Sequence, residues 1–269
     1  MELEEKLARF RRQGAIVPTR ALLKTPEQIR GIKESARINV AVLDYVAAHI
    51  GPGITTAQID LWVYEQTTRL GGIPAPLGYN SFPRSVCTSV NDQVCHGIPS
   101  ENDILKEGDI VSLDAGLIYQ GYHSDAARTH AVGKISPEAE QLIRVTKQSF
   151  FEGIRYAKAG CHLHEISAAI NDYVEPFGYG IVKDLVGHGI GEHLHEDPQI
   201  PNFRQRRRGI KLVPGMTLAI EPMINAGTWE VLWLDDDWTV VTEDGSLSAH
   251  YENTVLITDG EPEILTLSL

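Results

Sequence analysis

The hydrophobic positions that follow Thr25 recur every three or four residues, which is the spacing of one face of a helix. Thr25 is a suitable N-cap, Pro26 suits the first helical position, and Gln28 can complete a capping box. The apolar face is made of Ile29, Ile32, Ala36, Val40, Leu43 and Ala47. The pattern therefore predicts a long amphipathic helix that begins at Pro26.

A second helix and several strands are predicted further along the chain. Ser136-Pro137-Glu138 is another helix start, and the apolar positions after it are Leu142, Val145, Phe150 and Ile154. Short apolar runs predict strands at Asp109–Asp114 and Met216–Ile220, and near Val231–Leu234, Thr239–Thr242 and Thr254–Ile257. Asp244-Gly245 predicts a hairpin turn between two of these strands. Together these elements predict an α/β (α+β) fold.

One pattern occurs twice, at an offset of 107 residues. Four pairs of segments share the offset: Pro52-Gly53-Ile54 with Ala159-Gly160-Cys161, Ile59 with Ile166, Gly71-Gly72 with the region of Gly178, and Gly108–Asp114 with Gly215–Glu221. In each half a glycine turn leads into an apolar strand that ends on a carboxylate. We expect internally duplicated α/β halves, with Asp114 and Glu221 at equivalent places near a pseudo-two-fold axis.

The composition excludes several classes of protein. The formal net charge of −12 argues against DNA as a partner, because phosphate binding needs a basic face. The first residues lack the basic start and apolar stretch of a secretory signal, and no apolar run approaches the roughly 18 residues of a membrane span. Cys87, Cys95 and Cys161 are few and odd in number, which fits free thiols in a reducing compartment. A cytoplasmic protein with no membrane partner is expected.

Asp114 and Asp125 are the first candidates for chemistry. Asp114 ends an apolar strand, Tyr119-Gln120-Gly121-Tyr122 resembles a turn, and Asp125 would lie on the returning strand. Such a hairpin can place both carboxylates side by side, where one would be protonated unless a cation lies between them. The alternative interpretation is a pair of solvated turn aspartates.

Three further residues have the side chains of metal ligands. His188 has a glycine on each side, which leaves its imidazole accessible, and imidazole is a common metal ligand. Glu221 ends an apolar strand, and Glu252 lies on another probable strand. Each of the three could instead be an ordinary structural residue. With Asp114 and Asp125 they make four carboxylates and one histidine, a donor set that suits Mn²⁺, Fe²⁺ or Co²⁺ and accepts Zn²⁺.

At this point the chain resembles the type I methionine aminopeptidases, which have the fold called pita-bread. The segments that carry the resemblance are Ser89–Pro99, Leu113-Asp114 with His123-Ser124-Asp125, Gly187–Gly191, His195–Pro198, Ala219–Met223 and Asp244–Ala249. They lie between about Thr25 and Thr258. We expect residues 1–22 to be a polar, partly helical N-terminal extension and residues 23–269 to be a single catalytic domain. A central antiparallel sheet is expected in that domain, with the metal site near the pseudo-two-fold axis.

The resemblance implies a site with two divalent metal ions that activate water against the peptide bond. It assigns Asp114 to one ion, Asp125 and Glu252 to a bridge between the ions, and His188 and Glu221 to the other ion. Glu221 counts among the catalytic residues as well. A structural monovalent cation is also implied, held by backbone oxygens near Asn91, Gln93 and Ser248.

The substrate implied by the resemblance is the N-terminal methionine of nascent polypeptides that have a small second residue. His96 and His195 are assigned to the substrate as catalytic groups that do not bind metal. The methionine pocket would be lined by Tyr79, Phe82, Cys87, Leu194 and Trp238, because a thioether packs well against aromatic edges and sulfur. All seven residues could otherwise be plain loop or core residues.

Three positions depart from the usual family pattern. His250 and Asn253 stand where glutamine and histidine are usual, and Leu194 replaces a frequent phenylalanine. None of the three is an expected ligand, so the departures affect the tuning of the site rather than the reaction.

The run Arg204–Arg208 has two interpretations, a solvated loop or a contact with ribosomal RNA, so that association with the ribosome is a possible partner interaction. The chain is otherwise expected to be a monomer. Two other functions fit the same scaffold: a proline-directed aminopeptidase or dipeptidase, and a binding protein without catalysis. The motifs around His96 and Glu221 argue against the first, and the complete set of five ligands argues against the second.

Overall fold

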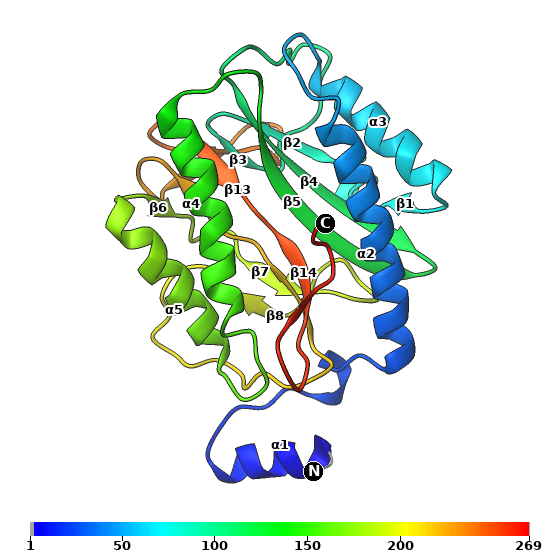
Figure 1. The fold of residues 1–269 in the computed structure, drawn as a ribbon, viewed down its shortest axis with the longest axis vertical. Helices are drawn as coiled ribbons and strands as arrows, with labels where there is room; N and C mark the ends of the chain where they lie inside the picture. Colours follow the sequence, from blue (N-terminus) through cyan, green and yellow to red (C-terminus); the bar gives the residue numbers. More distant parts are fainter. Residues whose placement is uncertain (1–2, 269) are drawn as a thin grey trace.

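Helices flank a central group of antiparallel strands in the computed structural model, which describes residues 3–268 (Figure 1). The helices are α1 (Leu3–Arg12), α2 (Pro26–Ala47), α3 (Thr56–Arg69), α4 (Pro137–Ile154) and α5 (Leu163–Val174), with 3-10 turns at Arg20–Leu22, Tyr79–Ser81 and Glu175–Phe177. In Figure 1, α2 and α3 cover one side of the central strands and α4 and α5 cover the other. This is the mixed α/β architecture that the sequence predicts.

The strands pair in four antiparallel sheets. The first sheet contains β1 (Ile73–Pro74), β2 (Cys87–Val90), β4 (Ile110–Tyr119) and β5 (Tyr122–Ala131). The second contains β6 (Gly180–Ile181), β10 (Met223–Asn225) and β13 (Ser248–His250), and the third contains β3 (Gln93–Cys95), β11 (Val231–Trp233) and β12 (Val240–Thr242). The fourth contains β7 (Gly187–Gly189), β8 (Glu196–Ile200), β9 (Thr217–Ile220), β14 (Asn253–Leu256) and β15 (Glu263–Ile264).

The two halves of the chain have the same order of elements, as the duplicated pattern predicts. The first-half elements α3, β1 and β4 each begin 107 residues before the second-half elements α5, β6 and β9. Hydrogen bonds repeat at the same offset, because the Gly53 N–H donates to the carbonyl of Leu105 and the Gly160 N–H donates to the carbonyl of Leu212. The two halves therefore share equivalent turns, and equivalent strands follow these turns.

Glycine is required where each of these strands begins. Gly108 precedes β4 with φ of 94° and Gly215 precedes β9 with φ of 91°, in a region that other residues rarely adopt. The two strands lead to Asp114 and Glu221, so the repeated turn brings one carboxylate from each half to the middle of the molecule.

Helix α2 begins with the predicted capping box, because the Thr25 side chain accepts from the backbone N–H of Gln28 and the Gln28 side chain accepts from the backbone N–H of Thr25. Its buried face differs from the predicted one: Ala47 is exposed, while the polar residues Ser35 and Asn39 are fully buried. Ser35 Oγ donates to the carbonyl of Leu117 at 2.9 Å, and Asn39 Nδ2 donates to the carbonyl of Ala115 at 2.6 Å. These bonds fix α2 against β4.

The predicted hairpin with its turn at Tyr119–Tyr122 is present as β4 and β5, but the prediction that the first strand ends at Asp114 is wrong, because β4 continues to Tyr119. Its ten-residue strands pair from Ile110 with Ala131 to Tyr119 with Tyr122. The second half is interrupted instead: Glu221-Pro222 separates β9 from β10, and Tyr251-Glu252 separates β13 from β14. Proline has no N–H to donate to a sheet, which accounts for the first interruption.

The hairpin predicted at Asp244-Gly245 is wrong. A turn is present there, but the strands around it do not pair with each other, since β12 pairs with β11 and β3 while β13, the next strand, pairs with β10. Asp244 instead accepts hydrogen bonds from the backbone N–H groups of Thr228 and Ser246. A local turn signal cannot report that a strand pairs with a distant segment.

The N-terminal segment packs on the rest of the chain. Leu7 and Phe10 of α1 are buried in the hydrophobic core of the second half, and the Lys211 N–H donates to the carbonyl of Ile16. α1 lies at one end of the molecule in Figure 1. No helix within residues 3–268 is both long enough and apolar enough to cross a membrane.

Candidate metal and substrate site

The two halves bring four carboxylates and a histidine together beside the central strands. Asp114 pairs with Ala127 and Asp125 pairs with Gly116, so both aspartates face the same side of the β4–β5 hairpin. Glu252 is attached to this hairpin, because its N–H donates to the carbonyl of Ala127 at 3.0 Å. The interrupted strands of the second half thereby reach the regular hairpin of the first.

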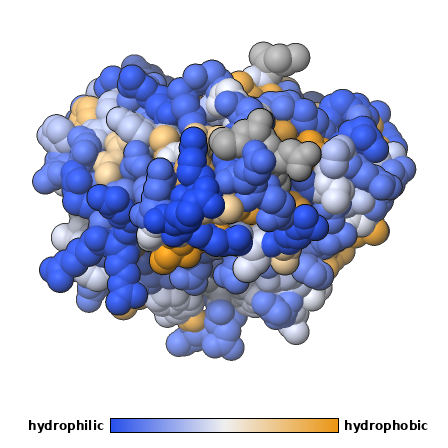
Figure 2. Space-filling view, turned by 90° about the horizontal axis from the view of Figure 1, so that it is seen from below, coloured by the Kyte–Doolittle hydropathy of each residue, from blue (hydrophilic) through white to orange (hydrophobic). Residues whose placement is uncertain are grey.

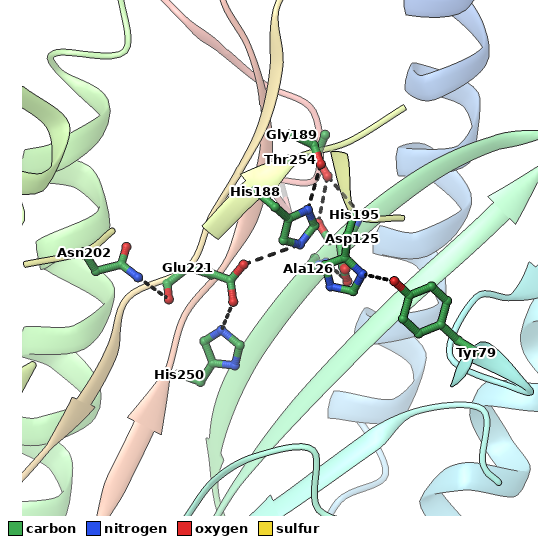
Figure 3. Close-up of polar contacts among 10 residues, drawn as sticks. All are labelled: Tyr79, Asp125, Ala126, His188, Gly189, His195, Asn202, Glu221, His250 and Thr254. Carbon is green, nitrogen blue, oxygen red and sulfur yellow. Dashed lines mark hydrogen bonds and ion pairs between the residues drawn. The ribbon is translucent and has the colours of Figure 1, made fainter. Parts of the chain in front are cut away.

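His188 is held in one tautomer by its own strand. Its Nδ1 lies 2.8 Å from the carbonyl oxygen of Gly189, and since a carbonyl only accepts, Nδ1 carries the proton. The lone pair of Nε2 is therefore free, and this atom lies 3.5 Å from Oε1 of Glu221 (Figure 3). Ligand atoms of Asp125, His188 and Glu252 all lie within 4.8 Å of one another.

The unpaired oxygens of this cluster fit a divalent cation. Oε1 of Glu221 and Oε1 of Glu252 are buried and have no hydrogen-bond partner among the described residues. A buried polar atom without a partner is costly, and a carboxylate oxygen more so. A metal ion would satisfy both oxygens, and the mixture of carboxylates with one imidazole is a donor set for first-row metals.

Burial shifts the pKa of each group in the cluster. Desolvation raises the pKa of Asp114 to about 6, and it lowers the pKa of His188 to about 4. Desolvation and then the charges of neighbouring carboxylates raise the pKa values of Asp125, Glu221 and Glu252 well above their usual range. The raised pKa values mean that, without a cation, carboxyl groups of the cluster bind protons in place of metal.

A cavity of about 350 Å³ lies against the cluster. Its walls are Pro76, Tyr79, Asn80, Phe82, Cys87, His96, Asp114, Gly116, Asp125, Leu194, His195 and Trp238. All seven residues predicted for substrate contact are in this list. Trp238 meets Phe82 edge to face with ring centroids 5.1 Å apart. Burial raises the pKa of the Cys87 thiol, which stays protonated and serves as an apolar wall rather than a nucleophile.

His96 and His195 border the cavity from opposite halves of the chain. His195 Nδ1 lies 2.7 Å from the Tyr79 hydroxyl, and its ring lies 4.3 Å from the ring of His188 (Figure 3). His96 has a φ of 56°, which is unusual for a residue other than glycine and marks a constrained position. Desolvation lowers the pKa of His96 to about 4, so this histidine is neutral at physiological pH.

His250 is a neighbour of the cluster that the sequence did not identify as part of the site. It is 2% exposed, neither ring nitrogen has a hydrogen-bond partner within residues 3–268, and Nε2 lies 3.9 Å from Oε2 of Glu221 (Figure 3). The one feature of the sequence that could have pointed to His250 is that histidine stands where glutamine is usual in the family. Three wall residues, Pro76, Asn80 and Gly116, were not identified from the sequence.

Comparison with known proteins supports one family. The model of metallopeptidase family M24 matches residues 30–259. Methionine aminopeptidase of Clostridium acetobutylicum is 51% identical over 246 residues, which cover 91% of this chain and 98% of that protein. The crystal structure of methionine aminopeptidase from Thermotoga maritima has a TM-score of 0.89 at 43% identity, and that from Rickettsia prowazekii has 0.89 at 38%. Each covers 91% of this chain and 99% of the other.

Proposed function

The chain belongs to metallopeptidase family M24 and, within it, to the methionine aminopeptidases, and from that premise we propose how its site removes an N-terminal methionine. The reaction is hydrolysis of the bond between methionine and the second residue. One observation carries the proposal: Asp114 and Asp125 of the buried cluster form one end of a cavity whose other walls are mainly apolar and aromatic.

We propose that the cluster holds two divalent ions of the group Co²⁺, Mn²⁺, Fe²⁺ and Zn²⁺. Asp114 would bind one ion, Asp125 and Glu252 would bridge the pair, and His188 with Glu221 would bind the other. When bound, the ions supply Lewis acidity that activates water and polarises the peptide carbonyl. Two carboxylate oxygens that lack partners and a free Nε2 on His188 support this assignment.

The cavity selects methionine by shape and polarisability in this proposal. The rings of Tyr79, Phe82 and Trp238 and the sulfur of Cys87 give apolar and polarisable walls, against which a flexible thioether packs well. Leu194 closes the cavity beside Gly116, because a Cβ added to Gly116 would lie 3.2 Å from Cδ1 of Leu194. A small second residue is favoured because the cluster and the histidines crowd the space beyond the methionine.

His96 and His195 act on the substrate in this proposal. Negative charge develops on the carbonyl oxygen as water adds to the peptide bond. With the Tyr79 hydroxyl donating to Nδ1, the proton of His195 lies on Nε2, from which it can be donated to that oxygen. A donor aimed at developing charge stabilises the transition state more than the bound substrate. Neutral His96 is available for a hydrogen bond to the scissile amide.

A peptide panel tests the function. We expect the metal-loaded enzyme to release methionine from Met-Ala-Ser much faster than from Met-Lys-Ser, and to leave Ala-Pro-Ser intact. Mass spectrometry of the products gives kcat/KM for each peptide. Equal values for the two methionine peptides would refute the selectivity, while preferred cleavage before proline would favour the proline-directed alternative.

We also propose the less direct features of this function. The chain would act as a cytoplasmic monomer close to the ribosome, and a monovalent cation would bind near Asn91 and Ser248. The ribosomal contact is supported by three exposed basic residues, Arg206, Arg207 and Arg208. Nearby in the chain, the ammonium of Lys211 lies 5.5 Å from the ring of Phe10 on α1. The basic segment therefore lies near the end of the molecule that carries α1. Figure 2 shows that end as largely hydrophilic. Salt-sensitive cosedimentation with ribosomes, lost when the three arginines become serine, is the test.

A further inference from the structure

The segment between β7 and β8 contains two cavity residues, Leu194 and His195, and the side chain of Glu196 holds its backbone through hydrogen bonds. Oε1 of Glu196 accepts the N–H of Glu192 at 2.9 Å and the N–H of His193 at 3.0 Å. The segment is thereby folded back on Glu196. Its shape depends on where that carboxylate lies.

The other oxygen of Glu196 is held from the far end of the sequence. Oε2 pairs with Nζ of Lys24, at the junction between the N-terminal segment and α2. The side chain of Lys24 is 5% exposed and that of Glu196 is 13% exposed, so solvent screens this ion pair poorly. The Lys24 N–H also donates to the carbonyl of Gly215 at 2.8 Å, which ties the same residue to the entry of the strand that ends at Glu221.

The lysine reaches Glu196 through space left by a glycine. A Cβ added to Gly191 would lie 2.4 Å from Cε of Lys24, which is closer than real contacts allow, and 3.2 Å from Oε1 of Glu196. Gly191 does not have a positive φ. Glycine at this position therefore leaves the space through which the lysine stem passes, and a side chain there would displace the end of Lys24.

We propose that Lys24 and Glu196 are a positioning pair for His195, through which the N-terminal segment is coupled to the turnover step. The pair fixes the backbone from Gly191 to Glu196, and that backbone aims the His195 ring at the Tyr79 hydroxyl and at the reacting carbonyl. None of the five proposed ligands lies on this segment, so the pair acts on substrate geometry and leaves metal binding intact. This inference rests on the role proposed above for His195.

Lys24→Met is the main test, because it keeps the length of the stem and removes the charge. A displacement of about 1 Å at a reacting group costs about 100-fold in rate, so we expect kcat to fall by about 10- to 100-fold. Metal content, measured by elemental analysis, should equal that of the wild type. In a His195→Ala background the same substitution should reduce kcat no further, since its effect passes through His195.

Glu196→Gln is a second route to the same result. It keeps an oxygen for the two backbone N–H groups and loses the charge that faces Lys24, so kcat should fall in the same direction if Lys24→Met does not fold. Lys33→Met is the matched control, because Lys33 on α2 pairs with Glu263 at the surface, where the side chains are 40% and 47% exposed. Its kcat should equal the wild-type value.

Four outcomes separate the claims. Wild-type kcat in both Lys24→Met and Glu196→Gln, or a loss that adds fully to that of His195→Ala, overturns the positioning pair. Loss of metal in Lys24→Met overturns it as well, because the pair would then act on the cluster. If His195→Ala itself keeps wild-type kcat while the peptide panel behaves as expected, the role of His195 is wrong and the methionine aminopeptidase function stands.

Discussion

Two buried acidic regions border one another in this molecule, and they differ in how their charges are satisfied. Both oxygens of Glu196 have donors, which are two backbone N–H groups and the ammonium of Lys24. In the cluster of Asp114, Asp125, Glu221 and Glu252, two buried oxygens have no hydrogen-bond partner in the part of the chain that the structure describes. In the first region the protein alone therefore supplies a partner for each carboxylate oxygen, while in the second a cation is needed to satisfy the two remaining oxygens.

The pKa values follow the same division. Desolvation raises the pKa of every carboxyl in the cluster, and the charges of neighbouring carboxylates raise the pKa of Asp125, Glu221 and Glu252 further. No lysine or arginine side chain compensates Asp114, Asp125 or Glu221 among the described contacts. Arg128 partly offsets the charge of Glu252, and its Nη1 donates to the backbone carbonyl of Glu252. Four acidic groups kept close at this energetic cost indicate a site selected for binding rather than for stability.

The largest predicted effect removes a ligand from the second region. His188→Ala and Glu221→Ala should each weaken metal binding by more than about 100-fold and lose activity with it, because ligand loss exceeds the 10- to 100-fold effect of outer residues. Calorimetric titration with Mn²⁺ or Co²⁺ measures the affinity. A variant that kept both ions and wild-type turnover would show that the cluster is not the metal site.

The next prediction concerns His195, which lies between the two regions. His195→Ala should keep its metals and nearly its KM while kcat falls by about 10²–10³, or about 2.7–4 kcal/mol, as for loss of one donor to developing charge. Metal content, melting temperature and kcat are measured on one preparation. A variant that lost thermal stability with unchanged turnover per folded molecule would identify His195 as a structural residue.

A pH titration sharpens the contrast further. Metal binding must displace protons from carboxyls whose pKa is raised, among them Asp114 at about 6. Affinity should therefore fall by about tenfold per pH unit for each displaced proton as the pH decreases below about 6. Calorimetric titration in buffers of different ionisation enthalpy gives the number of protons that metal binding releases. An affinity that does not change between pH 5 and pH 8 would contradict the raised pKa values.

The smallest effect should appear in the metal-free protein. The pKa of Glu221 is higher in the folded than in the unfolded state, so this group reduces the free energy of unfolding once the pH exceeds its unfolded pKa of about 4.5. Glu221→Gln removes that penalty and should raise the melting temperature by a few degrees at pH 8, with no gain at pH 4. Calorimetry of both proteins in chelator tests this, and equal melting temperatures at pH 8 would contradict it.

Local signals in the sequence were sufficient for many elements of the fold. The cap at Thr25, the cap at Ser136 and the hairpin turn at Tyr119–Tyr122 lie where they were predicted, because each depends on residues only a few positions apart. The hairpin at Asp244-Gly245 failed for the same reason, since a turn says nothing about which strand its neighbours pair with. The buried polar face of α2 was missed because Ser35 and Asn39 bond to β4, about 80 residues away.

By itself the sequence determined the caps, the glycine turns repeated at an offset of 107 residues, and the residue types of the site, including His188, Glu221 and most of the wall residues of the cavity. Only the tertiary structure decided which of these groups are buried together. Desolvation, repulsion among the carboxylates, the isolation of His250, and the pairing of Lys24 with Glu196 at a separation of 172 residues all depend on packing between distant segments. Charge energies depend on distance and on surrounding solvent, and neither is a property of neighbouring positions in a chain.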